Sequence, residues 1–252
     1  MHESVLLNET IESLNLKDNS IVVDMTLGFA GHSSQILKRI KNGYLFAFDQ
    51  DEEALAFSKE KLSKISDNFQ IIDSNFVYAK EKLKELGVEK VDGILYDLGV
   101  SSPQLDEDYR GFSYRFDAPL DMRMDQDNKL TAKIIVNTYS YDKLKKIFKE
   151  YGESKFSSNI ARNIVKYRES KEIDSTLELV DIIKSSVPYK ERLKKHPAKQ
   201  IFQALRIEVN DELNVLKKSL DDSLSMLNVG GRIAVITFHS LEDKIVKHKF
   251  LE

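Results

Sequence analysis

The chain has 252 residues, a formal net charge of −3 and a hydrophobic fraction of 41%, which is ordinary for a globular protein. It has no cysteine, which excludes disulfides, thiolate metal sites and a cysteine nucleophile, and we expect a reducing, cytoplasmic location. No signal peptide is visible at the start of the sequence, and no apolar run approaches the ~20 residues that span a bilayer. We therefore expect no membrane association.

The first informative stretch is 21–33, an apolar strand followed by a glycine turn and the polar start of a helix. A second apolar strand, 43–49, ends in Asp49. Glycines such as Gly28 and Gly31 let a backbone approach a ligand, and a carboxylate at the next strand end can accept both ribose hydroxyls. The pattern predicts an adenosine-containing cofactor. Because the dinucleotide fingerprint G-x-G-x-x-G is absent, S-adenosylmethionine is favoured. On this turn alone, a purely structural role is an equally good interpretation.

Two more strands are expected at 69–73 and 91–97, separated by apolar residues at helical spacing. Alternating strands and helices predict a parallel sheet, whose ligands bind at the carboxyl ends of the strands. Each acidic strand end, taken alone, is more often a helix cap or a solvated turn. Together they outline one cofactor rim, made of Asp24, Gly28, Asp49, the Ser74-Asn75-Phe76 turn and Asp97.

The stretch from 106 to 199 carries no strand signal, and we expect an inserted helical domain there. Ser175-Thr176-Leu177-Glu178 has the spacing of a capping box. Beyond Pro197, an apolar stripe from 201 to 227 predicts one long helix, ended by the glycines of 228–231. A fifth strand is expected at 232–238. The expected domains are 1–105 with 200–252, and 106–199.

The insertion also holds the basic residues. Lysines at 143–149 and a basic cluster at 190–199 accompany the arginine- and aromatic-rich piece 110–116. Cations for phosphates and ring faces for unstacked bases are what a single-stranded nucleic acid needs. For the lysines at 143–149, a solvated helix face is the better interpretation. The arginine–aromatic piece favours RNA, because several apolar rings in a loop are costly without a partner.

Long motifs then resemble one known family over the whole chain. They are His2–Glu9, Thr26–Ser33, Asp97–Asp106, Arg110–Ser113, Pro119–Met124, His196–Ala198, Phe202–Ile207 and Phe238–Asp243. In these stretches the chain resembles the RsmH (MraW) family. The resemblance implies an S-adenosylmethionine-dependent enzyme that methylates N4 of a cytidine in small-subunit (16S) ribosomal RNA near the decoding centre. It also implies an α/β, Rossmann-like class I methyltransferase sheet with an inserted helical domain. The RNA partner would be free rRNA or the assembled small subunit.

The resemblance also implies which residues contact the cofactor, and most of them lie on the rim already described. They are Ala30, Gly31, His32, Asp49, Phe76, Asp97 and Gln104, beside Gly28 of the glycine turn. Ala30 stands where the family usually has a second glycine. Family members also run on for several dozen residues beyond Glu252. Without that tail, the fifth strand would be an open sheet edge, which predicts self-association.

The chemistry of the expected reaction points to a loop at a strand tip. The N4 amine of cytosine is a poor nucleophile and needs acceptors for its N–H groups. We expect Ser101 or Ser102 to accept from it, with ordinary turn chemistry a nearly equal alternative, while Asp97 serves the cofactor. The base must leave its stack, and Phe112 or a neighbouring ring is expected to hold it. Candidate phosphate or base contacts are Arg110, Arg123, His196, Arg206 and, ranked last, His239.

Two rival functions remain at this stage. A nicotinamide oxidoreductase is disfavoured, because neither G-x-G-x-x-G nor an obvious hydride-transfer dyad is present. The other rival is a non-catalytic RNA-binding or assembly protein that kept the fold. No metal-ligating constellation stands out in the sequence.

Overall fold

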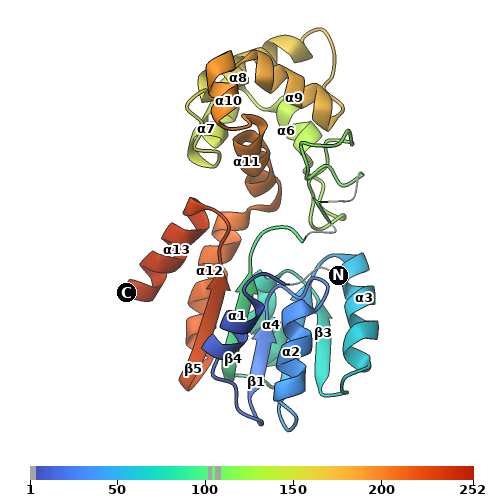
Figure 1. Cartoon of the computed structure of the whole chain (residues 1–252), viewed down its shortest axis with the longest axis vertical. Coiled ribbons are helices and arrows are strands. Elements are labelled where there is room, and N and C mark those ends of the chain that lie inside the picture. Colours follow the sequence, from blue (N-terminus) through green and yellow to red (C-terminus); the bar gives the residue numbers. More distant parts are fainter. Residues whose placement is uncertain (1–3, 102–103, 106–108) are drawn as a thin grey trace. The chain divides into compact units, whose positions relative to one another are not determined.

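The computed structural model describes residues 4–101, 104–105 and 109–252, in two compact units (Figure 1). The sheet unit comprises 1–99 and 213–252, and the helical unit comprises 100–212. The sequence analysis places these divisions at 105/106 and 199/200 instead. Each unit has a hydrophobic core of its own.

A five-stranded parallel sheet forms the centre of the sheet unit. Its strands are β1 (Ile21–Asp24), β2 (Tyr44–Asp49), β3 (Phe69–Asp73), β4 (Val91–Asp97) and β5 (Leu227–Ile236), in the order β3-β2-β1-β4-β5. Val23 lies opposite Phe46 on one side and Ile94 on the other, and all three side chains are buried, as expected for central strands covered on both faces. The parallel α/β sheet confirms the predicted fold class and the first four predicted strands.

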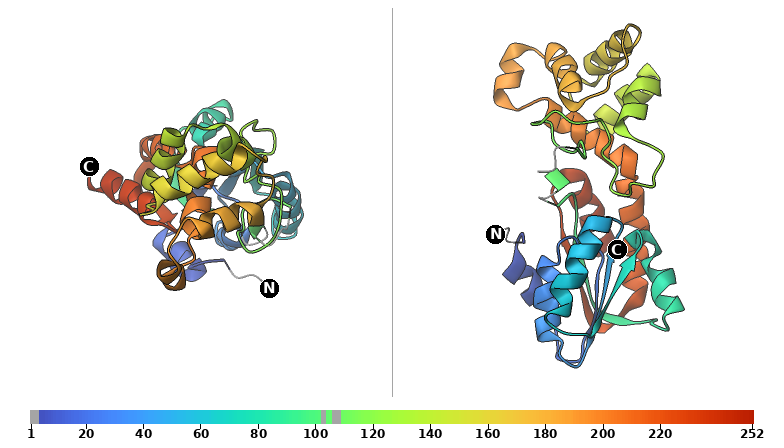
Figure 2. Two further views of the ribbon diagram at one scale, coloured as in Figure 1. Left: turned by 90° about the horizontal axis from the view of Figure 1, so that it is seen from above. Right: turned by 90° about the vertical axis from the view of Figure 1, so that its right-hand side faces the viewer.

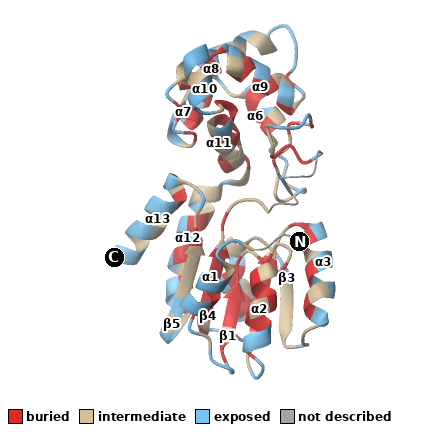
Figure 3. Cartoon of the chain, viewed as in Figure 1, coloured by how far each residue is buried: buried red, intermediate tan, exposed pale blue. Residues whose placement is uncertain are grey.

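Helices cover both faces of this sheet (Figure 2). Alternate residues of β1 point to opposite faces, so Val22 packs with α1 (Leu7–Ser13), α2 (Gly31–Arg39) and α3 (Glu52–Ser63). Val23 packs on the other face, with α4 (Ala79–Glu85) and α12 (Glu212–Met226). The short 3-10 helix η1 (Phe76–Tyr78) precedes α4, and α13 (Ser240–Leu251) follows β5. This burial leaves only the strand ends and loops to form a site (Figure 3).

Six helices are described in the helical unit. They are α6 (Ala132–Thr138), α7 (Tyr141–Glu150), α8 (Ser157–Arg168), α9 (Thr176–Ser185), α10 (Tyr189–Lys194) and α11 (Ala198–Asn210). The Ser175 hydroxyl accepts the Glu178 N–H at 3.3 Å, as the capping box predicts. The returning Glu178 carboxylate accepts from the Asp174 N–H at 3.0 Å. These polar caps leave the apolar faces of the helices free to form one buried core.

The predicted long helix from 201 to 227 is wrong, because the structure has two helices there. Asp211 takes a left-handed conformation, with φ 49°, between α11 and α12. Asp tolerates this conformation better than most residues, and the apolar stripe continues on both sides of the break. Residues 228–231 begin β5 instead of ending a helix, and the strand stops at Ile236. A register shift at Val91/Gly93 and the positive φ of Gly230 accommodate the irregular start.

β5 lies at the edge of the sheet that the structure describes, and Val229 is fully exposed there. Self-association through this edge stays a prediction. In the described part of the chain, none of the helices has the length and apolar character needed to cross a bilayer.

Candidate active site

Hydrogen bonds tie together the ends of β1 and β4. The buried Asp24 carboxylate accepts the Thr26 N–H at 3.0 Å and the Ser33 hydroxyl at 2.6 Å. The Thr26 hydroxyl oxygen in turn accepts the Asp97 N–H at 2.6 Å. Burial raises the pKa of Asp24, against the opposing effect of its bond from Ser33. Asp24 is therefore a structural acceptor inside the turn. Sequence analysis missed Thr26 and Ser33, whose only signal is a pair of hydroxyls beside a strand-end carboxylate.

The Asp49 carboxylate, at the end of β2, holds the glycine turn. Its Oδ2 accepts the Gly28 N–H at 2.8 Å, and its Oδ1 accepts the N–H groups of Gln50 at 2.8 Å and Asp51 at 3.0 Å. Burial raises the pKa of Asp49 to about 6, although these three N–H groups lower it. A carboxylate has about four acceptor positions, so capacity remains on Oδ2 for a ligand hydroxyl.

The glycine turn between β1 and α2 leaves room for a ligand. Gly28 has φ 49°, and a Cβ added there would meet no atom within 4 Å. Ala30 also adopts the left-handed conformation, with φ 57°, and is completely buried. That conformation costs a non-glycine residue roughly 1–2 kcal/mol, which explains why glycine suits this position. The open space beside Gly28 and the spare capacity of Asp49 fit an adenosine cofactor held at the turn.

Asp97 and His32 form an electrostatic pair at the end of β4. The Asp97 Oδ2 lies 3.6 Å from the Nδ1 of His32, and the His32 Nε2 lies 3.1 Å from the Val5 carbonyl oxygen. Burial raises the pKa of Asp97 to about 6, with the His32 charge opposing and the Asp24 charge adding to the shift. Phe76 follows β3 and packs edge-on against Tyr96, with ring centroids 5.5 Å apart. The sheet unit thus brings the predicted cofactor residues of β1, β2 and β4 to the same end of the sheet.

Ser101 and Gln104 belong to the helical unit and bond to each other. The Ser101 hydroxyl oxygen accepts the Gln104 N–H at 3.3 Å, and the Gln104 amide oxygen accepts the Ser101 N–H at 3.0 Å. This reciprocal pair is a capping box, the turn chemistry that the sequence analysis left open for Ser101. The second predicted serine, Ser102, lies outside the described residues.

Two residues predicted to contact RNA lie inside the helical unit. The buried Arg110 donates from Nη2 to the carbonyls of Arg123 at 3.1 Å and Met124 at 3.4 Å, and its guanidinium lies 5.6 Å from the Phe112 ring. Phe112 is 6% exposed and belongs to the core. A ring buried in this way offers little face to a flipped base, and the stacking role expected of Phe112 or a neighbouring ring stays a prediction.

Two further arginines are engaged with carboxylates. Arg123 binds Asp121 through Nε at 2.8 Å and Nη2 at 2.9 Å. Arg206 binds Glu212 in the same bidentate way, at 2.8 and 3.0 Å. Such planar pairs fix the orientation of the guanidinium. His196 stacks on Tyr114, with ring centroids 4.7 Å apart and planes at 24°.

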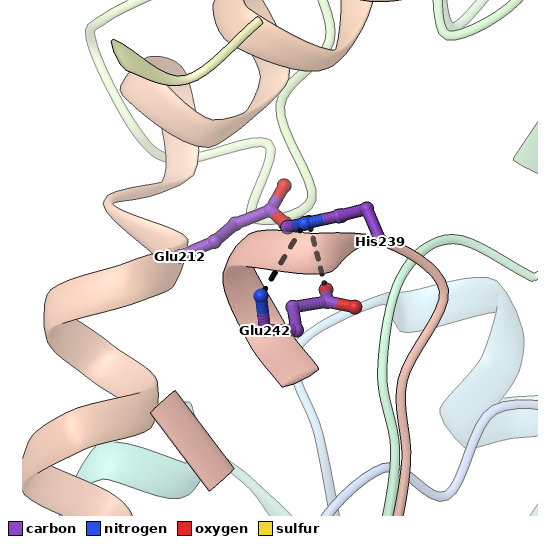
Figure 4. A group of neighbouring side chains, drawn as sticks. All are labelled: Glu212, His239 and Glu242. Carbon is purple, nitrogen blue, oxygen red and sulfur yellow. Dashed lines mark hydrogen bonds and ion pairs between the residues drawn. The ribbon is translucent and has the colours of Figure 1, made fainter. Parts of the chain in front are cut away.

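His239 caps α13, and its ring lies beside Glu242 (Figure 4). Its Nδ1 accepts the Glu242 N–H at 3.4 Å, and its Nε2 lies 3.2 Å from the Glu242 Oε1. The other Glu242 oxygen accepts the Phe238 N–H at 2.8 Å. Glu212, also drawn, is the residue that pairs with Arg206. His239 is thus a helix cap in this structure, the role that ranked it last as an RNA contact.

Exposed basic and aromatic side chains do occur in the arginine-rich piece, three and four residues beyond Phe112. Arg115 and Phe116 are both exposed, Phe116 by 47%. The backbone N–H of Arg115 donates to the Ser113 hydroxyl at 3.1 Å, and the Phe116 carbonyl accepts from the Thr176 hydroxyl at 2.6 Å. The arginine- and aromatic-rich composition of 110–116 was the signal in the sequence for these two residues. Sequence alone could not tell which members face solvent.

Comparison with known proteins places the chain in a family. The MraW methylase family model matches residues 1–252, the whole chain. Similar solved structures include an rRNA methylase from Streptococcus thermophilus, with 22% identity and a TM-score of 0.33, covering 50% of this chain and 76% of that one. Another is fibrillarin from Aeropyrum pernix with natively bound S-adenosyl-L-methionine, at 18% identity and a TM-score of 0.30, covering 33% of this chain and 36% of that one.

A third similar structure is an rRNA-methylase candidate from Clostridium thermocellum, at 19% identity and a TM-score of 0.34. The match covers 40% of this chain and 54% of that one, about half its length. With TM-scores this low, the assignment rests on the family match alone. That match confirms the resemblance read from the sequence and S-adenosylmethionine as the cofactor. The chain belongs to the MraW methylase family.

Proposed function

We propose that the protein transfers the methyl group of S-adenosylmethionine to the exocyclic N4 of a cytidine in small-subunit (16S) ribosomal RNA near the decoding centre. The observation that carries the proposal is the match of the whole chain to the MraW methylase family. The motifs Asp97–Asp106 and Pro119–Met124, which resemble that family most closely, support the finer assignment.

The sheet unit would bind the methyl donor at its carboxyl rim. Asp49 would accept a ribose hydroxyl with the remaining capacity of its Oδ2, while its bond to the Gly28 N–H keeps the turn open. Asp97 would face the donor from the end of β4. When bound, the donor supplies an electrophilic methyl group on a sulfonium. The protein's own contribution is then alignment and exclusion of water.

The base side of the reaction would depend on the loop after β4. The Ser101 oxygen has two lone pairs, of which the Gln104 N–H occupies one. The other could accept an N–H of the N4 amine and help the nitrogen to pyramidalise and lose its proton. Ser101 therefore stays a proposed catalytic residue, and Ser102 stays a proposal from sequence.

A methyl-transfer assay tests the proposal. The protein is incubated with tritiated S-adenosylmethionine and, in parallel reactions, with free 16S rRNA or with small ribosomal subunits. Digestion and mass spectrometry of the nucleosides should find N4-methylcytidine. Methyl label on another base or ring position would refute the N4 assignment. Transfer to one substrate only would identify the natural form of the RNA. Calorimetry should show binding of S-adenosylmethionine and none of NAD.

The variant Asp49→Ala tests the proposed cofactor site. It should raise the dissociation constant of S-adenosylmethionine by about 10- to 100-fold, because bonds to a carboxylate are worth roughly 1.5–3 kcal/mol. The circular dichroism spectrum should be unchanged. An unchanged dissociation constant would refute the cofactor site proposed at the glycine turn.

A further inference from the structure

His32 makes both of its polar contacts with the protein. It lies in the first turn of α2 and is 5% exposed. Its Nε2 faces the Val5 carbonyl oxygen at 3.1 Å, and its Nδ1 faces the Asp97 Oδ2 at 3.6 Å. A carbonyl oxygen can only accept, so Nε2 carries the hydrogen of the first contact. The first contact is a hydrogen bond, and the second, at 3.6 Å, is a longer contact between a ring nitrogen and a carboxylate oxygen.

The first contact holds the segment of residues 4–6, here called the N-terminal strap. Ser4 packs closely on Gly31, where an added Cβ would overlap the Ser4 hydroxyl and lie 2.9 Å from the Ser4 Cβ. The strap therefore crosses the start of α2, next to the glycine turn. Val5 and Leu6 are 46% and 55% exposed, so their apolar burial holds the strap weakly. The bond from His32 is a specific anchor.

The second contact reaches the end of β4. The backbone of Asp97 is fixed by its bond to Thr26, but its carboxylate is partly exposed, at 26%. The charge of His32 lowers the pKa of Asp97, opposing the effect of burial. One ring thus contacts both a weakly buried segment and a carboxylate of the rim.

We propose that His32 is a positioning residue that anchors the N-terminal strap through Nε2 and orients the Asp97 carboxylate through Nδ1. The part that concerns Asp97 rests on the proposed function, in which Asp97 faces S-adenosylmethionine. The part that concerns the strap depends only on the protein. Two side-chain amides separate the two roles, because the amide nitrogen of glutamine matches the reach of Nε2 and that of asparagine the reach of Nδ1.

The strap is tested with a single spin label. The chain has no cysteine, so Val5→Cys provides one thiol while keeping the backbone carbonyl that His32 contacts. The motion of a nitroxide attached at this position should be restricted in the Val5→Cys protein with His32 intact, here called the parent chain, and in its His32→Gln variant. It should become mobile in His32→Ala and His32→Asn. His248→Ala, which removes an imidazole that is 83% exposed on α13, is the matched control and should leave the label restricted.

The orientation of Asp97 is tested by calorimetry with S-adenosylmethionine. His32→Ala and His32→Gln should raise the dissociation constant about three- to tenfold, the loss expected for one polar interaction. His32→Asn should raise it less than these two variants, because its amide nitrogen keeps the reach of Nδ1 toward Asp97. His248→Ala should bind normally, and thermal unfolding should confirm that every variant is folded.

The possible outcomes separate the two proposals. A label that stays restricted in His32→Ala would refute the anchoring role. Equal effects of Gln and Asn in both measurements would refute the division between Nε2 and Nδ1. If the parent chain did not bind S-adenosylmethionine, the proposed function and the role through Asp97 would fail, while the label would still decide the role in the strap.

Discussion

At the scale of single residues, the carboxylates at the strand ends differ in what they contact. The Asp24 carboxylate accepts hydrogen bonds from within the turn. The Asp49 carboxylate also holds the turn but can accept a further hydrogen bond, and the Asp97 carboxylate lies 3.6 Å from the His32 ring. Burial raises the pKa of all three carboxylates. Keeping partly desolvated carboxylates costs the protein free energy of folding. A ligand whose hydroxyls donate hydrogen bonds to them would offset part of that cost.

The raised pKa of Asp49 predicts a specific dependence of stability on pH. A carboxyl whose pKa rises from 3.8 to about 6 on folding contributes stability below pH 3.8 and loses it as the pH rises through about 6. Relative to Asp49→Asn, which cannot ionise, the native chain should therefore lose about 1–3 kcal/mol between pH 4 and pH 7. Urea denaturation of both proteins across this range measures the difference. Parallel stability curves would contradict the raised pKa.

Exposure also predicts which residues of the arginine-rich piece bind RNA. Arg115→Ala should weaken RNA binding and lower the slope of log affinity against log salt by about one. Phe116→Ala should cost about 1–3 kcal/mol if the ring stacks on a base. Arg110→Ala, by contrast, should reduce stability, because it leaves two buried carbonyls without their donor. Filter binding at several salt concentrations, with melting curves, distinguishes these effects. Unchanged RNA affinity in both exposed variants would exclude this surface.

At the scale of elements, a buried hydroxyl cluster connects the sheet to a helix from the far end of the sequence. The Tyr96 hydroxyl, in β4, lies 2.6 Å from the Ser219 hydroxyl and 2.7 Å from the Ser223 hydroxyl, both on α12. Burial raises the pKa of Tyr96 to about 12. The spacing of the two serines, one helical turn apart, lets a single phenol bond both.

Removing this phenol should weaken the packing of α12 on the sheet. Tyr96→Phe should lower the free energy of unfolding by about 1–2 kcal/mol, because two buried hydroxyls lose a partner. Tyr78→Phe, at a tyrosine that is 50% exposed, is the control and should change stability by less than about 0.5 kcal/mol. Urea denaturation measures both. Equal stability of the two variants would show that the serines find other partners.

At the scale of the whole molecule, the chain builds two cores. One core lies in the helical unit. The other belongs to the sheet unit and consists of two layers of apolar side chains, one on each face of the sheet. The chain passes between the units at 99/100 and at 212/213. The sheet unit is thus assembled from segments far apart in the sequence, while the helical unit is continuous.

Separate cores predict separate responses to the methyl donor. Calorimetric unfolding should show two transitions, and S-adenosylmethionine should raise the midpoint of the one that belongs to the sheet unit. At 100 times the dissociation constant the stabilisation should be about 2.7 kcal/mol. Hydrogen exchange assigns each transition to its unit. A single transition that shifts as a whole would show that the two units unfold together.

The sequence by itself determined the first four strands, the parallel sheet, the carboxylates at the strand ends and the family. Alternating apolar segments, strand-end acids and long motifs are local patterns, and they can be read without knowing what packs against them. It also predicted the capping of α9 by Ser175, because the cap and its partner are three residues apart.

Only the tertiary structure decided what each polar group contacts. The break at Asp211 lies within an uninterrupted apolar stripe, so periodicity could not reveal it. The burial of Arg110 and Phe112 and the exposure of Arg115 depend on the packing of the whole helical unit, and His32 contacts residues 27 and 65 positions away along the chain. The direction of a side chain and the identity of its partner are set by long-range packing, which no local pattern encodes.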